Sequence, residues 1–179
     1  MSLTENYFQL FDLPEQYQLD SAALRNTYRE LQRKTHPDKF TDASQHEQML
    51  AVQYAATIND AHDVLKSPLK RAIYMLKLRG IEMNEQGSAA LDPEFLMEQM
   101  QLREELEQAA HAADPETALE KVTEHLEQEL AVLQDKFAEQ IDQGYSGELS
   151  AALETVNKMQ FLVKLETEVE HLEHELLND

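Results

Sequence analysis

Residues 115–142 carry the most regular apolar pattern in the chain, and this pattern constrains the fold more than any other feature. Seven apolar side chains recur every three or four residues, so they fall within a sector of about 100° on an α-helix. These are Leu119, Val122, Leu126, Leu130, Leu133, Phe137 and Ile141. A helix of this kind is stable in water only when its apolar stripe packs against neighbouring helices.

Start and stop signals delimit three helices in the second half of the chain. Asp92-Pro93 and Asp114-Pro115 repeat one start signal, an aspartate N-cap followed by proline at the first helical position. Gly144 and Gly147 separate the last two helices. The predicted helices span about 93–112, 115–142 and 148–177. Helices joined by short turns bury their apolar faces only by folding back on one another, so we expect an antiparallel three-helix bundle over residues 92–179.

The first half of the chain predicts four shorter helical segments. A short apolar segment at 5–11 comes first, and Asp20 then caps a helix that runs to Thr35. Ser44 and Glu47 have the spacing of a capping box at the start of the next helix. The last helix begins at Ser67-Pro68 and ends at Gly80. We expect these segments to fold as one domain over residues 1–79.

The composition favours helices throughout. The chain has only 4 Gly and 5 Pro and no Trp, and Leu, Ala, Glu and Gln recur everywhere. We therefore expect an all-α protein without a sheet. Residues 80–91 hold two glycines and show no clear periodicity, which predicts a linker between the two domains.

Charge and cysteine content exclude several classes of function. Residues 1–80 contain 10 Lys+Arg and 10 Asp+Glu, whereas residues 81–179 contain 5 and 25. The acidic second half would repel phosphates, so we expect no nucleic-acid partner. The absence of cysteine excludes disulfides, thiolate metal sites and thiol catalysis. No apolar run approaches the roughly 20 residues of a membrane span and no leader pattern is present, so we expect a cytoplasmic protein without a membrane partner.

The tripeptide His36-Pro37-Asp38 ends the helix that begins after Asp20. Proline disfavours a helical conformation of the preceding residue, so the helix must end near Thr35. His36 and Asp38 therefore project from a turn. Nothing in the sequence brings a third metal ligand to them, and no nucleophile and base are placed together. We expect no metal, no cofactor and no enzymatic activity.

The helix before this turn has a basic face. Arg25, Arg29 and Arg33 recur every four residues, about 130° away from the apolar side, and only Glu30 opposes them. Charged residues on a helix most often form a solvated face. Here the regular spacing beside a rigid turn favours docking onto an acidic partner.

Two segments of the first domain resemble a J-domain. Residues 24–39 read LRNTYRELQRKTHPDK and resemble its basic second helix and loop, and residues 58–68, INDAHDVLKSP, resemble the helix that follows. The resemblance implies a docking module that stimulates ATP hydrolysis by a DnaK-like chaperone. The chaperone-binding residues that it implies are Arg25, Arg29, Arg33, Lys34, His36, Pro37 and Asp38.

The first helix of the bundle has a second apolar sector. One face of this helix is apolar enough to pack in the bundle and holds Phe95, Leu102, Leu106 and Ala109. Leu96, Met97 and Met100 lie about 100° to 200° from Phe95, on a sector that continues as Glu104 and Glu107. This apolar patch is either a binding site, for which methionine is well suited, or a surface that packs against the first domain. The wheel geometry favours neither alternative.

Residues 95–106, FLMEQMQLREEL, and 159–165, MQFLVKL, resemble the HscB co-chaperones of iron-sulfur cluster assembly, and the resemblance covers essentially the whole chain. It implies that an HscA-type chaperone binds the J-domain and that an IscU-type scaffold protein binds the bundle. The implied scaffold-binding residues are Leu96, Met97, Met100, Glu104 and Phe161. Phe161 also lies beside Leu165 and Leu172 on its helix, so packing in the core is an alternative for it.

A chain without cysteine cannot hold an iron-sulfur cluster through thiolates, so we expect it to deliver the scaffold protein rather than carry the cluster. The competing interpretation is a general J-protein whose bundle presents unfolded chains or other clients to a DnaK-like chaperone. The zinc-binding and Gly/Phe-rich regions of general J-proteins are missing, which leaves client selection to the bundle.

Overall fold

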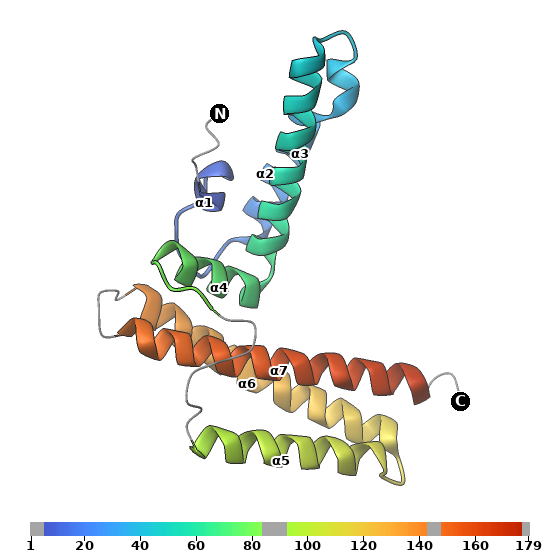
Figure 1. The fold of residues 1–179 in the computed structure, drawn as a ribbon. Helices are drawn as coiled ribbons and strands as arrows, with labels where there is room; N and C mark the ends of the chain where they lie inside the picture. Colours follow the sequence, from blue (N-terminus) through green and yellow to red (C-terminus); the bar gives the residue numbers. More distant parts are fainter. Residues whose placement is uncertain (1–5, 84–92, 143–147, 177–179) are drawn as a thin grey trace. The chain divides into compact units, whose positions relative to one another are not determined.

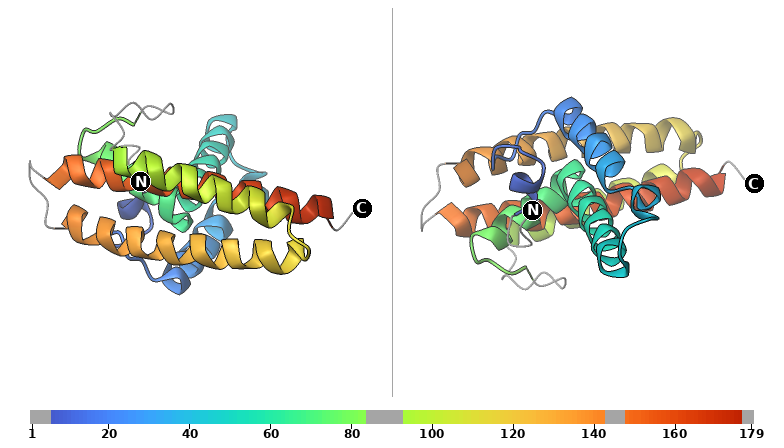
Figure 2. Two further views of the ribbon diagram at one scale, coloured as in Figure 1. Left: turned by 90° about the horizontal axis from the view of Figure 1, so that it is seen from below. Right: turned by 90° about the horizontal axis from the view of Figure 1, so that it is seen from above.

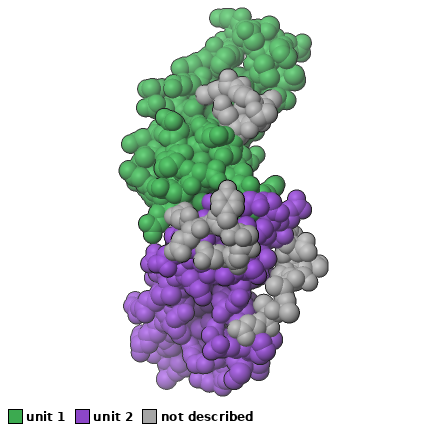
Figure 3. All heavy atoms as spheres, turned by 90° about the vertical axis from the view of Figure 1, so that its left-hand side faces the viewer, with its two compact units in different colours: residues 1–78 green, residues 79–179 purple. Residues whose placement is uncertain are grey.

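A computed structural model of the protein describes residues 6–83, 93–142 and 148–176. These residues form helices and connecting turns, and no strand occurs among them, which confirms the predicted all-α fold (Figure 1). The chain divides into two compact units, Met1–Leu78 and Arg79–Asp179, which are coloured separately in Figure 3. Most of the predicted linker at 80–91 lies outside the described residues, and its bounds remain a prediction.

Residues 6–78 of the first unit form four α-helices and one short 3₁₀ helix. They are α1 (Tyr7–Leu10), α2 (Ser21–Thr35), η1 (Pro37–Phe40), α3 (Gln45–Lys66) and α4 (Pro68–Leu78). α2 and α3 form an antiparallel hairpin, and α1 packs beside α3 and α4 at the end of the hairpin away from η1 (Figure 1). The sequence predicts a turn at residues 36–43, and the structure folds half of it into η1.

Two of the predicted helix starts in the first unit are confirmed in detail. Asp20 Oδ1 accepts hydrogen bonds from the backbone N–H groups of Ala22 and Ala23, at 2.8 and 3.2 Å. At the start of α3 the Ser44 N–H donates to Glu47 Oε2 at 2.9 Å, while the Glu47 N–H donates to Ser44 Oγ at 3.4 Å. These reciprocal bonds satisfy backbone donors that the first helical turn leaves without partners.

The core of the first unit is built from the predicted apolar faces. Leu24 and Leu31 of α2 are buried against α3, which contributes Ala51, Ile58, Ala61 and Leu65. Phe8 and Phe11 close the base of the hairpin. The ring of Tyr7 stacks on Tyr74 of α4 at 4.5 Å, and the Tyr7 N–H donates to the Tyr74 hydroxyl at 2.9 Å. With its apolar side buried, α2 presents its arginines to solvent.

The second unit is the predicted antiparallel bundle of α5 (Pro93–Ala110), α6 (Pro115–Asp142) and α7 (Glu148–Leu176). Figure 2 shows the three helices running side by side with alternating directions. α5 ends two residues before the predicted 112, and the Asp114 carboxylate accepts from the Thr117 N–H at 3.2 Å as the predicted cap of α6. Asp92, Gly144 and Gly147 lie outside the described residues.

The bundle core confirms the predicted apolar stripe of residues 115–142. Of its seven side chains, five are buried and Val122 and Leu133 are half-buried. α7 contributes the facing layer, which consists of Ala152, Val156, Met159, Leu162, Leu165 and Val169. α5 adds Phe95, Leu106 and Ala109. Each helix therefore buries one face and leaves the rest of its surface to solvent.

A stack of three rings fixes the pairing of α2 with α3. His62 of α3 lies 3.9 Å from the ring of Tyr28 and 6.5 Å from that of Phe11, nearly parallel to the first. The pKa of His62 lies below its ordinary value because burial disfavours the charged imidazolium, and Lys66 repels that charge further while Asp63 opposes the shift. The stack is therefore built for a neutral histidine.

We predict that acid destabilises the first unit through His62. The unfolded chain takes up the proton near the ordinary pKa of about 6.5, before the folded chain does, so the free energy of unfolding falls as pH drops below that value. His62→Phe keeps a planar ring and removes the titration. Urea unfolding followed by tyrosine near-ultraviolet circular dichroism, at pH 8 and pH 5.5, should show a smaller loss of stability for the variant. Equal losses would contradict this role of His62.

Candidate docking surfaces

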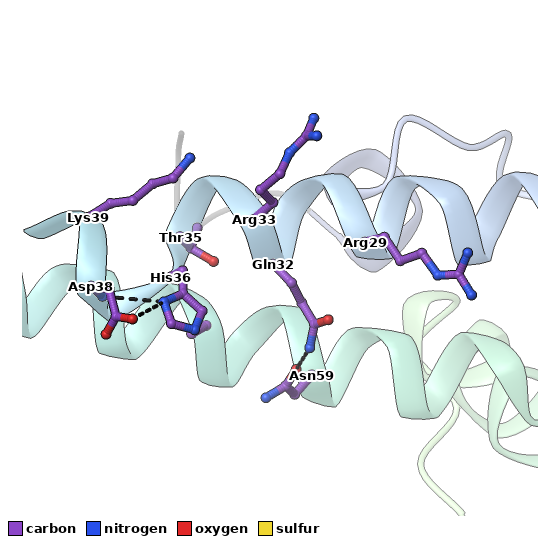
Figure 4. Close-up of a pocket in the computed structure, with 9 residues that line it drawn as sticks. Arg29, Gln32, Arg33, Thr35, His36, Asp38, Lys39 and Asn59 are labelled. Atoms are coloured by element: carbon purple, nitrogen blue, oxygen red, sulfur yellow. Dashed lines mark hydrogen bonds and ion pairs between the residues drawn. The ribbon is translucent and has the colours of Figure 1, made fainter.

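The first candidate surface is a groove at the loop end of the α2–α3 hairpin. It has a volume of about 750 Å³ and is lined by residues of α2, η1 and α3 together with His36. Figure 4 draws the nine lining residues as sticks and labels eight of them. The complete lining consists of Arg29, Gln32, Arg33, Thr35, His36, Asp38, Lys39, Ala55 and Asn59.

His36 organises the loop beside this groove. It is the residue between α2 and η1, and its Nδ1 accepts a hydrogen bond from the Asp38 N–H at 3.3 Å. The same Nδ1 lies 3.5 Å from Asp38 Oδ2. Because one nitrogen cannot accept and donate at once, the neutral ring bonds the backbone and the protonated ring faces the carboxylate. Either contact keeps the exposed His36 ring against Asp38, and Figure 4 marks both with dashed lines.

The groove is strongly cationic. Arg29, Arg33 and Lys39 line it, and Asp38 is the one acidic residue among the lining side chains. The predicted Arg25 and Lys34 are also exposed on α2, but they do not line the groove. Lys34 is displaced by about 100° around the helix from Arg33. The predicted basic residues therefore divide into a pair at the groove and two flanking positions.

A polar network that the sequence analysis missed supports the groove. The Tyr28 hydroxyl donates to Asn59 Oδ1 at 2.9 Å, and Gln32 Nε2 donates to the Tyr28 oxygen at 2.6 Å. Figure 4 shows Gln32 reaching from α2 toward Asn59 on α3. Together with the stack on His62, these bonds join α2 to α3 between the groove and the base of the hairpin. The sequence does place the polar side chain of Gln32 one turn after Tyr28. Its pairing with Asn59 could not be predicted, because that pairing depends on how α2 and α3 are aligned in the hairpin.

The second candidate surface is an apolar patch on α5, formed by Leu96, Met97 and Met100. Their side chains are 42%, 72% and 73% exposed, and they are among the most exposed large apolar side chains in the part of the chain that the structure describes. Glu104 is exposed one turn further along and accepts a hydrogen bond from Gln108 at 3.1 Å. Phe95, which precedes the patch, is buried. The separation of α5 into two apolar sectors is therefore confirmed.

Phe161 of α7 lies beneath this region in a row of cations and aromatic rings. Its ring meets Phe95 edge to face, with centroids 5.8 Å apart. The Lys158 ammonium lies 5.0 Å from the centroid of Phe95, and the Arg103 guanidinium lies 5.8 Å from that of Phe161. Such contacts between a cation and a ring face are attractive, particularly where water is partly excluded.

Ion pairs hold the same cations at the α5–α7 contact. Arg103 of α5 donates two hydrogen bonds to Glu168 of α7, at 3.3 and 3.4 Å. The Lys158 side chain is only 19% exposed and lies 4.0 Å from the carboxylates of both Glu98 and Glu154. Phe161 is half-buried. It therefore contributes to packing, which was the alternative to a binding role, and it also reaches the edge of the surface.

The rest of the bundle surface is acidic, and its charges are crowded. The pKa of Glu166 on α7 is raised, first because the carboxyl is partly buried and then because Glu127 and Glu170 repel its negative charge. Within the described residues no group of three His, Asp or Glu side chains is placed to hold a metal ion. No described helix combines the length and apolar character needed to cross a membrane.

Comparisons with known proteins find matches for both units of the chain. Residues 6–74 match the DnaJ domain family model, and residues 91–170 match that of the HSCB C-terminal oligomerisation domain. The co-chaperone protein HscB homolog of Vibrio cholerae is 48% identical over 96% of this chain and 99% of its own length. That of Colwellia psychrerythraea is 42% identical over 97% and 99%.

Solved structures show the same relationship. The chaperone HscB from Vibrio cholerae superimposes with a TM-score of 0.85 at 45% identity, covering 96% of this chain and 99% of that one. The human co-chaperone protein HscB also gives a TM-score of 0.85, at 30% identity, over 95% of this chain and 83% of its own. With a J-domain at its N-terminal end and the matching helical domain after it, this chain belongs to the HscB family of co-chaperones, J-proteins that work with DnaK-type chaperones.

Proposed function

We propose that this protein stimulates ATP hydrolysis by an HscA-type chaperone through its first unit and delivers an IscU-type iron-sulfur scaffold protein bound to its second. The observation that carries the proposal is the presence in one chain of two exposed surfaces of opposite chemistry. One is the cationic groove closed by His36 and Asp38, and the other is the apolar patch of Leu96, Met97 and Met100.

The groove suits an acidic surface on the chaperone. Arg29, Arg33 and Lys39 would raise the rate of encounter with such a surface and fix the orientation of the complex. Docking at the groove would bring the loop of His36 and Asp38 against the chaperone. Because His36 Nδ1 bonds within the loop, the direction of its ring is set before the chaperone arrives.

The patch suits a folded client with an apolar surface of its own. Leu96, Met97 and Met100 present apolar area that a partner can remove from water, at roughly 25 cal/mol for each Å² buried. The ion pairs and ring contacts of Arg103 and Lys158 keep α5 fixed on α7 beneath them. A fixed surface loses little conformational freedom on binding, which favours recognition of one folded partner over many unfolded chains.

Carrying both surfaces on one chain makes the chain an adaptor. A client bound to the second unit stays near any chaperone that is bound to the first. The second binding step then becomes intramolecular, with an effective concentration set by the connecting segment. The client therefore reaches the chaperone through the adaptor and does not need a strong affinity for the chaperone of its own.

A second candidate role for the bundle is self-association, because the family model that matches residues 91–170 is described as an oligomerisation domain. In that case the patch would bind another copy of the chain. A general J-protein activity toward unfolded clients is the remaining alternative.

We predict that His36→Gln abolishes stimulation of the chaperone's ATP turnover without unfolding the first unit. Glutamine cannot reproduce the fixed ring that caps η1. Steady-state ATPase assays measure the effect, and circular dichroism checks the fold. His46→Gln is the matched control, because His46 is exposed at the start of α3 and does not line the groove. Full stimulation by His36→Gln would rule out the proposed role of this loop.

We predict that Leu96, Met97, Met100 and Phe161 changed together to Ala weaken binding of the scaffold protein at least tenfold, because the variant loses most of the apolar contact area. Titration calorimetry measures the affinity. Val132→Ala is the control, because Val132 of α6 is 61% exposed outside the patch. The single variant Phe161→Ala separates packing from binding. Because Phe161 packs on Phe95, this variant should lower the melting temperature of the bundle more than the three α5 substitutions do.

Titration calorimetry, light scattering and binding of denatured polypeptide together decide between the three candidate roles. Binding of the folded scaffold protein that is lost in the quadruple variant supports delivery. Light scattering that shows a dimer of the wild-type chain and a monomer of the variant would instead support self-association. Equal binding of denatured polypeptide and folded scaffold protein would favour a general J-protein.

A further inference from the structure

The methionines of this chain differ sharply in exposure. Met97 and Met100 are 72% and 73% exposed, and Met49 in the first unit is 53% exposed. Met75 and Met159, in the cores of the two units, are fully buried. A diffusing oxidant must reach the sulfur atom to react, so the two patch methionines are the most accessible thioethers among the described residues.

The sequence leaves no faster redox group to protect them. The chain has no cysteine, so no thiolate competes for a peroxide. Met97 and Met100 supply two of the three side chains of the α5 patch, and they lie three residues apart on the same helix. Oxidation would therefore change the chemistry of this surface more than that of any other surface of the described chain.

The reaction balances with hydrogen peroxide as the oxidant. The thioether sulfur attacks one peroxide oxygen, the O–O bond breaks and an S–O bond forms. Sulfur loses two electrons and becomes a sulfoxide, and the other oxygen leaves as water after proton transfer. Methionine sulfoxide reductases reverse the change, so the modification can act as a switch.

The sulfoxides would affect binding but not folding. In the free protein both side chains face solvent, so the new S=O groups are hydrated and the core of the bundle is unchanged. When a client covers the patch, the same groups lose their water without gaining a partner. Stripping water from one polar group in this way lowers affinity by about tenfold, and two such groups lower it further.

We propose that Met97 and Met100 form an oxidation-sensitive switch, in which peroxide converts both thioethers to sulfoxides and thereby releases the scaffold protein while the J-domain remains active. This inference depends on the proposed function of the patch. It adds a condition under which delivery stops, namely exposure to peroxide, and a means of restoring delivery.

The test uses the full chain, treated with hydrogen peroxide and then freed of oxidant with catalase. Peptide mass spectrometry locates the sulfoxides, calorimetry measures scaffold binding, and an ATPase assay measures J-domain activity. Wild type should carry sulfoxides at Met97 and Met100 but not at Met75 or Met159, and should bind at least tenfold more weakly. Met97→Leu/Met100→Leu should bind equally well with and without treatment. Met49→Leu, the matched control, should respond as wild type does.

Each outcome bears on the inference. Unchanged affinity with both patch sulfoxides present would overturn it, and so would equal loss of binding by the Leu/Leu variant. Oxidation of Met75 and Met159 as fast as the patch methionines would show general damage instead of a switch. Untreated protein that does not bind the scaffold would overturn the proposed function, and this inference with it. Restored affinity after treatment with sulfoxide reductase would support it.

Discussion

Each long helix of this protein can bury only one face, and both candidate surfaces follow from that constraint. The stripe of α6 packs on α7, and α5 covers the pair with Phe95, Leu106 and Ala109. Once α5 is docked by that face, Leu96, Met97 and Met100 have no place in the bundle core. In the first unit α2 is docked by Leu24 and Leu31, which turns Arg29 and Arg33 outward beside the loop. Burial of one sector therefore exposes the other.

The two surfaces differ in charge as well as in polarity, and this difference separates their partners. The groove gathers Arg29, Arg33 and Lys39 in a unit whose charges balance overall. In the acidic second unit, the two cations nearest the patch are held at the α5–α7 contact. Arg103 is paired with Glu168, and Lys158 lies against Phe95 and two glutamates. Under the proposed function, an acidic surface on the chaperone would be attracted to the groove and repelled by the bundle.

Most of the fold was predictable from local signals, because helix caps and apolar periodicity act over a few residues. Asp20, Ser44 and Asp114 cap the helices that they were expected to cap. The His62 stack and the bond from Tyr28 to Asn59 were not predicted, because they join residues more than thirty positions apart. Their pairing depends on the hairpin register, which no single helix determines. The same holds for Lys158 and Phe95 at the α5–α7 contact.

An exposed apolar patch promotes unwanted association, and this disadvantage bears on which residues form it. Apolar side chains left in water favour unwanted association, and a polar residue at each position would make the free chain more soluble. The proposed function requires the patch to bind an apolar client, which a polar patch would not do, so under that proposal the surface must stay apolar despite this cost. Methionine offers a flexible, polarisable contact that adapts to a partner. Its sulfur also makes the patch chemically reactive, which leucine at Met97 and Met100 would avoid. In the proposed switch, adaptable binding and sensitivity to oxidants therefore come from the same two sulfur atoms.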